Sequence, residues 1–280
     1  MQQESRGKRM FQKLRRSLMA VVMGIAVMTN AMVVSAMDLN EKITVEQEFD
    51  QEFKEASSPH NLGKVTTELE FYKFSIKSPG KVKLKISGLS KKQKVYMVLY
   101  DKDYTSLTGD QKSLVFSESS MVFYLKSAGT YYFRLKCDSG ETVNASYTFE
   151  KRSNQGGTSF AKAVTLKKSE KKNGILGFDW PVEKNQYYKL KVAKEELVKI
   201  KFAKGNSSSD RDTLKVIVYK LINKKKQRID VGHLFEGQKS GTFYIRNSEN
   251  HKTEPGTYYI VVSKVYQTSG FDYSLTWLNK

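Results

Sequence analysis

The sequence predicts an all-β protein built from two tandem antiparallel β-sandwich domains, each with a jelly-roll-like arrangement. Three observations lead to this prediction: apolar residues alternate with lysines, Pro-Gly pairs separate the alternating segments, and several segments recur in the same order. Beyond the first 36 residues, only segment 45–56 shows helical periodicity. The predicted domains span residues 38–152 and 157–280.

The first 36 residues differ in character from the rest of the chain. A basic head precedes an unbroken apolar run, Leu18–Met28, and small residues follow at 34–36. The basic residues are Arg6, Lys8, Arg9, Lys13, Arg15 and Arg16. This order is typical of a secretory signal peptide. The alternative is an uncleaved membrane anchor, but Thr29 and Asn30 interrupt the run, and a spanning helix needs about 20 mostly apolar residues. We therefore expect a secreted protein, extracellular or at the cell surface, whose mature chain has no transmembrane span.

The net charge and the cysteine count limit the classes of molecule that this chain is expected to bind. The first 36 residues hold six basic residues and one acidic residue, so +14 of the formal charge of +19 belongs to the remaining chain. This basic balance favours an anionic partner. Cell-wall polymers, polysaccharide, extracellular matrix or a membrane surface fit an exported chain better than nucleic acid does. Cys137 is the only cysteine, so no internal disulfide forms; we expect a small buried hydrophobe there, with intermolecular pairing as the alternative. Few cysteines and many lysines suggest a bacterial source.

Alternation with a period of two predicts the strands. Segments 82–86, 188–192 and 198–202 each place apolar residues on one face and lysines on the other. This pattern is typical of antiparallel strands with one buried and one solvated face. Segments 95–100 and 216–219 are continuously apolar and predict strands nearer the centre of a sheet.

Turn residues separate the predicted strands. Segments 78–81 and 254–257 carry Pro then Gly at the two central positions that type II turns prefer. Segment 153–157, Ser-Asn-Gln-Gly-Gly, predicts a linker because small polar residues and paired glycines resist regular structure.

The segments also repeat along the chain. Segment 72–76 corresponds to 188–192 at an offset of 116 residues, and 129–132 corresponds to 256–259 at an offset of 127. The order of the matching segments is the same in both halves, and the offset grows slowly. This pattern predicts a tandem duplication whose second copy has longer loops.

Short motifs in both copies match a known family. They lie at 158–160, 163–166, 174–176, 187–190 and 255–259 in the second copy, and at 63–65, 70–74 and 129–132 in the first. In these segments both copies resemble the bacterial pre-peptidase C-terminal domain. The resemblance implies a β-sandwich that accompanies secreted enzymes and surface proteins, with matrix or polysaccharide binding and, in some members, calcium. Relatives often carry an acidic residue just before the Tyr-x-Phe strand, where this chain has Glu70 in the first copy and Gln186 in the second.

The sequence does not predict an enzyme. The histidines are His60, His233 and His251, and they lie in polar, loop-like contexts. Neither a zinc-binding H-E-x-x-H nor a nucleophile-elbow G-x-S-x-G occurs. We expect no catalytic residues, although a secreted hydrolase with an unrecognised site remains an alternative.

A metal site is one of the alternatives at Asp101 and Asp103, which follow a predicted strand. Alternate aspartates can direct two carboxylates at one Ca²⁺. Aspartate is also a common turn residue, and Lys102 lies between the two. We expect a turn and no cofactor, with calcium as the alternative.

Lysines and aromatic residues are the candidates for ligand binding. Lys189, Lys191, Lys199 and Lys201 fall on predicted outward faces, where they either attract an anionic polymer or serve as a solvated face that protects sheet edges. Trp180, Tyr132 and Tyr259 are the candidate stacking platforms for sugars, and packing inside or between domains is the alternative.

These observations favour a secreted, non-catalytic binding or adhesion protein that recognises anionic or neutral glycans of the cell envelope or host. The second hypothesis is an accessory or structural partner of a co-secreted hydrolase.

Overall fold

The computed structural model describes residues 54–55, 61–109, 112–115, 120–138, 142–205, 211–246 and 252–278. These residues form strands, turns and loops but no helix, and most strand pairs are antiparallel. The predicted all-β class is therefore confirmed. The predicted signal peptide lies outside these ranges, and of segment 45–56 only Lys54–Glu55, a short strand, is described. Within the described ranges, no helix has the length and apolar character needed to cross a membrane.

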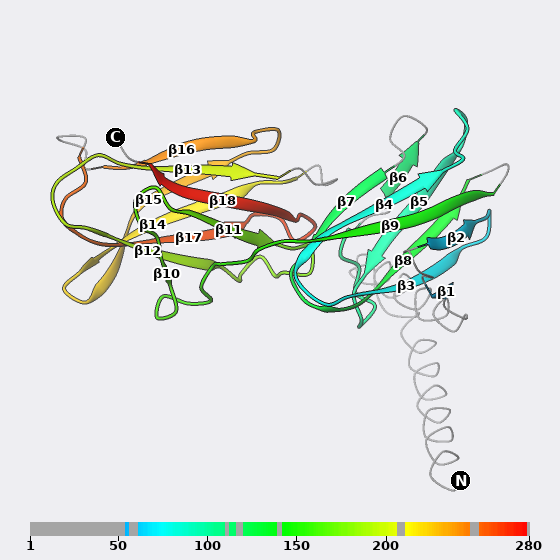
Figure 1. Cartoon of the computed structure of the whole chain (residues 1–280), viewed down its shortest axis with the longest axis horizontal. Helices are drawn as coiled ribbons and strands as arrows, with labels where there is room; N and C mark the ends of the chain where they lie inside the picture. The colour runs from blue at the N-terminus through cyan, green and yellow to red at the C-terminus, as the bar shows by residue number, and fades with distance from the viewer. Residues whose placement is uncertain are drawn as a thin grey trace, which may run out of the picture. The chain divides into compact units, whose positions relative to one another are not determined.

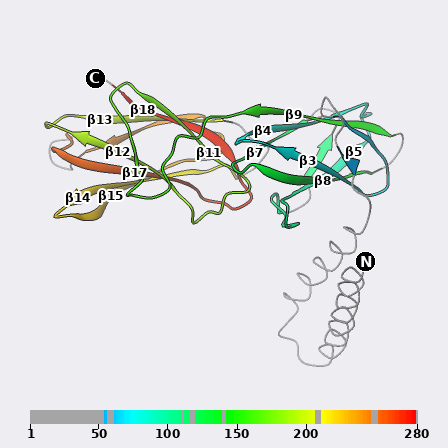
Figure 2. The same cartoon turned by 60° about the horizontal axis from the view of Figure 1, so that its bottom comes forward.

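The first half of the described chain forms two sheets that face each other across one core. The first sheet consists, in spatial order, of β1 (Lys54–Glu55), β3 (Glu70–Ile76), β8 (Gly129–Cys137), β5 (Lys94–Tyr100) and β6 (Lys112–Val115). The second consists of β2 (Asn61–Val65), β9 (Val143–Lys151), β4 (Gly80–Ser87) and β7 (Ser120–Leu125). Figure 1 shows these strands, and in Figure 2 β4 and β9 lie in one layer while β3 and β8 lie in the other.

The second half repeats this arrangement. One sheet consists of β10 (Val164–Thr165), β12 (Gln186–Val192), β17 (Gly256–Lys264), β14 (Leu214–Ile222) and β15 (Lys225–Leu234). The other consists of β11 (Lys171–Leu176), β18 (Phe271–Leu278), β13 (Val198–Lys204) and β16 (Ser240–Ile245). The short first strand of each five-stranded sheet pairs parallel to its neighbour, β1 with β3 and β10 with β12. The domain boundaries at 152 and 157 and their origin by duplication stay predictions.

Alternation buries the apolar residues as the sequence indicates. The apolar side chains of 82–86 in β4 and 198–202 in β13 are at most 1% exposed, and the lysines between them face outward. Each fully buried aliphatic or aromatic side chain contributes about 1.5–3 kcal/mol through removal from water. Cys137 belongs to the first core as a buried free thiol.

The predicted type II turns at the Pro-Gly pairs are wrong. A type II turn needs φ near +80° at its third residue, whereas Gly80 has no positive φ and Gly256 has φ +153°. Both glycines instead begin strands, β4 and β17. A Cβ atom on Gly80 would lie 2.3 Å from the ring of Phe149 and 2.6 Å from the carbonyl oxygen of Glu150. Glycine is needed there because β9 passes too close for a side chain.

The predicted linker is tied to β11 by hydrogen bonds. The N–H of Gln155 donates to the carbonyl of Asn173 at 2.8 Å, and the Asn173 N–H donates to the Gln155 side chain at 2.9 Å. The side chain of Asn154 accepts the N–H of Ile175 at 3.3 Å. The segment therefore continues the edge of the β11 sheet and fixes residues 151–153 beside it.

The two cores exchange aromatic residues. Phe178, which follows β11, is buried in the first core with its ring centroid 5.5 Å from that of Phe123. Tyr124 of β7 is buried in the second core. The N–H of Phe178 donates to the carbonyl of Tyr124 at 2.8 Å. Each core is therefore completed by a residue from the other half of the chain.

Asp179 holds the same junction by accepting three hydrogen bonds. Its carboxylate accepts the N–H groups of Lys126 and Ser127, each at 2.7 Å, and the Tyr131 hydroxyl at 3.0 Å. Hydrogen bonds to a charged group are worth about 1.5–3 kcal/mol each. This carboxylate therefore fixes the chain after β7 against the loop after β11.

Candidate functional site

The outer face of the sheet β11-β18-β13-β16 is polar and basic. Tyr273 and Leu275 of β18 point into the core, so Asp272, Ser274 and Thr276 point outward. Two cross-strand rows follow from the register: Lys171, Thr276, Lys201 and Thr242 in one, and Asn173, Ser274, Ala203 and Ser240 in the next. We call this surface the lysine–hydroxyl face.

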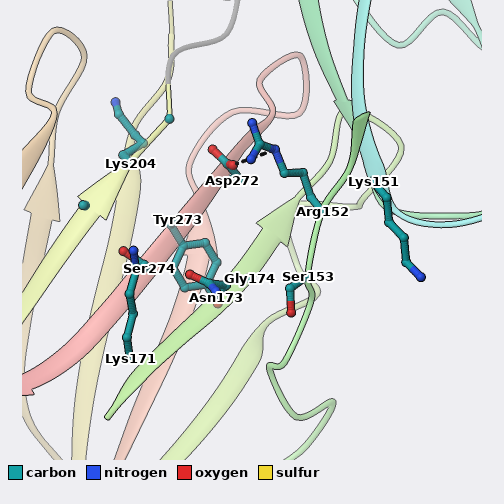
Figure 3. A pocket seen from close by; sticks show the side chains of 12 residues that line it. Lys151, Arg152, Ser153, Lys171, Asn173, Gly174, Lys204, Asp272, Tyr273 and Ser274 are labelled. Carbon is teal, nitrogen blue, oxygen red and sulfur yellow. Dashed lines mark ion pairs between the residues drawn. The ribbon is translucent and has the colours of Figure 1, made fainter. Parts of the chain in front are cut away.

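A pocket of about 460 Å³ lies at one end of this face, where the chain passes from β9 to β11 (Figure 3). Its walls come from residues 151–153 and from Lys171, Asn173, Asp272 and Ser274. In Figure 3 the guanidinium of Arg152 points toward Asp272, and Lys171 runs beside Ser274. The volume lies in the range of small-molecule sites, about 300–1,000 Å³.

The acidic group of the pocket already has partners in the protein. The Oδ2 atom of Asp272 lies 3.5 Å from Nε of Arg152, and Nη2 of Arg152 lies 2.9 Å from the carboxylate of Glu150. Burial and the Asp272 carboxylate, which accepts a hydrogen bond from the Tyr124 hydroxyl, raise the pKa of Tyr124. The negative charge of Asp272 is therefore compensated by groups that also fix its orientation.

The lysines of this face are not compensated. Lys171, Lys199 and Lys201 form no ion pair with any described residue. Neighbouring lysines differ, because Lys168 pairs with Glu196 and Lys172 pairs with Glu170. The face therefore presents unpaired cations among hydroxyl and amide groups.

Lys204 lines the pocket, but its amine does not point into it and adds no positive charge there. Its Nζ atom donates to the backbone carbonyls of Asp212 and Phe235, the latter at 3.1 Å. In Figure 3 its amine lies on the side away from Asp272. Burial lowers the pKa of this amine. The amine is engaged with the backbone and is not directed at the pocket.

The predicted lysines divide between two surfaces. Lys199 and Lys201 lie on the lysine–hydroxyl face. The partners of Lys201 across the sheet are Thr242 and Thr276, and those of Lys199 are Tyr244 and Leu278. Lys189 and Lys191 lie on the outer face of the opposite layer, on β12, where Lys189 pairs in register with Tyr259. The four lysines therefore do not form a single platform.

Trp180 is half-buried and one face of its ring is occupied. The Nζ atom of Lys126 lies 3.6 Å from the ring centroid, and the indole N–H donates to the carbonyl of Lys184 at 3.0 Å. Burial lowers the pKa of Lys126 to about 8. The ring packs against the second core, which places it in the packing role that the sequence left as the alternative to sugar stacking.

Tyr259 lies on the outer face of its sheet, between Lys189 on β12 and Tyr219 on β14. Its ring is half-buried beneath Phe160, whose centroid lies 5.3 Å away at 83°. Phe160 also contacts Tyr219, at 5.2 Å. A loop residue of the chain itself therefore covers this predicted platform.

Tyr132 occupies the equivalent position in the first half, between Lys73 on β3 and Tyr100 on β5. It is only 8% exposed, and the ring of Tyr104 lies 5.1 Å from it. Tyr132 therefore offers little surface for a sugar ring.

The loop of Asp101 and Asp103 has the geometry of a turn. Oδ1 of Asp101 accepts the N–H groups of Asp103 and Thr105, each at 2.9 Å. Lys102 pairs with Asp103 at 2.7 Å. No cluster of three or more His, Cys, Asp or Glu side chains suited to a metal occurs within the described ranges.

Glu70 and Gln186, which begin β3 and β12, each hydrogen-bond to a tyrosine of the core. Glu70 accepts a hydrogen bond from the Tyr72 hydroxyl. Gln186 is fully buried and accepts a hydrogen bond from the Tyr273 hydroxyl at 2.8 Å. Both side chains therefore serve the interior of their sandwiches.

Among the histidines, only His233 is described, and it stacks on Phe235 with ring centroids 5.5 Å apart. It lies on β15, in the other layer from the pocket.

Sequence reasoning noted Lys171 only as part of a lysine cluster, and it missed Arg152, Asn173, Asp272 and Ser274. They come from the end of β9, from β11 and from β18, so no local motif contains them. The one available signal was the alternation of 271–278, which places Asp272, Ser274 and Thr276 on a common face. Their approach to Arg152 depends on how the linker is held against β11.

Comparison with known proteins gives structural likeness only. No protein-family model matches the chain, and no curated protein matches it in sequence. The fold is similar to that of the pre-peptidase C-terminal domain of collagenase from Bacillus anthracis, with 16% identity, a TM-score of 0.30, and coverage of 45% of this chain and 98% of that one.

Two other structures are similar. One is a tandem CBM22 domain from Paenibacillus barcinonensis Xyn10C, with 8% identity, a TM-score of 0.24, and coverage of 73% of this chain and 82% of that one. The other is from a study of carbohydrate-binding modules of the β-sandwich superfamily, with 10% identity, a TM-score of 0.27, and coverage of 72% and 99%. At these low scores, function has to be inferred from the residues of the chain itself.

Proposed function

We propose that this protein is a secreted, non-catalytic binding protein that holds polysaccharide on its lysine–hydroxyl face. The observation that carries the proposal is the combination of a pocket of about 460 Å³ with an adjoining face of unpaired lysines and hydroxyl groups. Sugar recognition needs hydrogen-bonding groups in fixed positions, and strands of a packed sheet supply such positions. The signal-peptide pattern of residues 1–36 supports export.

The proposal includes the origin of the chain as two copies of one module that is similar to the pre-peptidase C-terminal domain. The strand orders β1-β3-β8-β5-β6 and β10-β12-β17-β14-β15 support it, because corresponding strands occupy corresponding places. The second copy then carries the proposed site, and the end of the first copy contributes one wall of its pocket.

A matched pair of double variants tests the function. Lys199→Gln with Lys201→Gln removes two charges from the lysine–hydroxyl face, and Lys189→Gln with Lys191→Gln removes two from the opposite layer. An exposed ionic contact is worth about 0.2–1 kcal/mol, so the loss of two contacts in the first pair is expected to weaken binding about twofold to thirtyfold. The second pair should leave it unchanged.

The measurement is retention of the purified chain by insoluble cell-wall polysaccharide and its retardation in gels that contain soluble polysaccharides. If the chain binds none of the polymers, the proposed function is rejected. If both double variants lose binding equally, the assignment to the lysine–hydroxyl face is rejected. Release of reducing ends from a bound polymer would contradict the non-catalytic part of the proposal.

A further inference from the structure

We propose that the pocket selects an acidic sugar, a hydroxyl-rich ring that bears a carboxylate, and that Lys171 is its main cationic contact. The inference rests on the proposed polysaccharide binding and adds the chemical class of the ligand. It concerns the pocket, whereas the proposed function concerns the whole face.

Charge is the first step. The pocket is lined by Lys151, Arg152 and Lys171, and its acidic group is Asp272. Because Asp272 already faces Arg152 and Tyr124, it does not neutralise Lys171, which pairs with no described residue. A bound carboxylate would supply the missing counter-charge. A neutral sugar would leave the amine without one.

Position is the second step. Lys171 and Asn173 are alternate residues of β11, so their side chains point to the same side about 7 Å apart. Asn173 pairs in register with Ser274, and Lys171 with Thr276. The amine therefore stands at one end of a row of amide and hydroxyl groups, which can hydrogen-bond the ring hydroxyls of the sugar whose carboxylate it binds.

Continuity is the third step. The row that begins with Lys171 continues across the sheet to Lys201, and Lys199 follows on the same face of β13. A polymer with a carboxylate on successive residues would meet further unpaired amines after it leaves the pocket. This spacing favours an acidic polysaccharide over an isolated acidic sugar.

Polygalacturonate and its fully methyl-esterified form provide the test, because they share ring and linkage and differ in the carboxylate. Affinity electrophoresis of the full chain at low salt should show at least tenfold tighter binding to the acid form. Lys171→Gln should weaken that binding at least threefold, and Lys191→Gln, an equal charge change on the opposite layer, should not.

The outcomes separate the two proposals. Equal binding of acid and ester would overturn the acidic-sugar inference while leaving polysaccharide binding intact. Binding to neither form would also overturn that inference, and it would overturn the proposed function only if cell-wall polysaccharide and the other polymers are not bound either. Dextran sulfate bound as tightly as polygalacturonate, with equal losses from Lys171→Gln and Lys191→Gln, would indicate general polyanion attraction and also overturn the inference. Circular dichroism of each variant checks that its fold is retained.

Discussion

At the scale of single residues, the chain buries Lys264 and half-buries Lys126. Lys264 is 2% exposed, and its Nζ atom donates to the carbonyls of Gly177, Gln267 and Ser269, each at 2.8 Å. Burial lowers the pKa of Lys264 to about 8 and, near Trp180, that of Lys126 to about 8. Both lysines lie at the junction of the two halves, so the protonation of the junction is linked to its stability.

This linkage predicts that stability rises with pH between about pH 8 and pH 9. In that window the unfolded chain keeps the protons on these lysines, whose ordinary pKa is 10.5, and the folded chain releases them. Because the unfolded state then binds more protons, the free energy of unfolding increases with pH. One unit of pKa shift corresponds to about 1.4 kcal/mol, so we expect an increase of about 1 kcal/mol from Lys264 alone over this window. Nearer pH 10 the buried tyrosines oppose the rise, because burial raises their pKa and the unfolded chain releases their protons first.

Urea denaturation across this pH range is the measurement, with Lys264→Met as the comparison. The variant lacks the titrating group, so its slope against pH should be smaller than that of the wild type. It should also lose about 1–3 kcal/mol because three carbonyls no longer have their donor. A wild-type slope no steeper than that of Lys264→Met between pH 8 and pH 9 would show that Lys264 keeps its proton in the folded state.

At the scale of strands, the sequence pattern predicts which side of each strand is buried. It does not predict which other strands or loops pack beside that strand. Segment 198–202 was expected to bury its apolar residues and does so, because period-two alternation is a local property. The pocket could not be predicted, since Arg152 meets Asp272 only through the pairing of β11 with β18 and the linker bonds. The covering of Tyr259 by Phe160 also depends on a loop path that no periodicity encodes.

Gly80 gives a prediction at this scale, because it begins β4 beside β9, its paired neighbour in the same sheet. Gly80→Ala puts a methyl group against the Phe149 ring and the Glu150 carbonyl, and overpacking of this kind costs about 1–3 kcal/mol. Gly241→Ala on β16 is the control, because its nearest neighbour is the flexible end of Leu234 at 3.2 Å. In urea denaturation, the free energy of unfolding should fall for Gly80→Ala and should change by less than about 0.5 kcal/mol for Gly241→Ala. Equal effects would mean that β9 can move aside.

At the scale of the whole described chain, the two halves are joined by more than a linker. Phe178 completes the first core, Tyr124 completes the second, and Asp179 binds the backbone after β7. Domains joined by small polar contacts are expected to move and unfold independently. A shared apolar junction makes the loss of one core costly for the other, and it also keeps Arg152 beside the sheet that carries Asp272.

This junction predicts that both halves unfold in one cooperative transition. Calorimetry should give a single endotherm whose calorimetric and van't Hoff enthalpies agree. Phe178→Ala should cost about 3–5 kcal/mol, because it empties a site in the first core, and should broaden or split the transition as the coupling weakens. Val265→Ala, at a side chain that is 37% exposed, should change little. Two separate wild-type transitions would mean that the exchanged aromatics do not couple the cores.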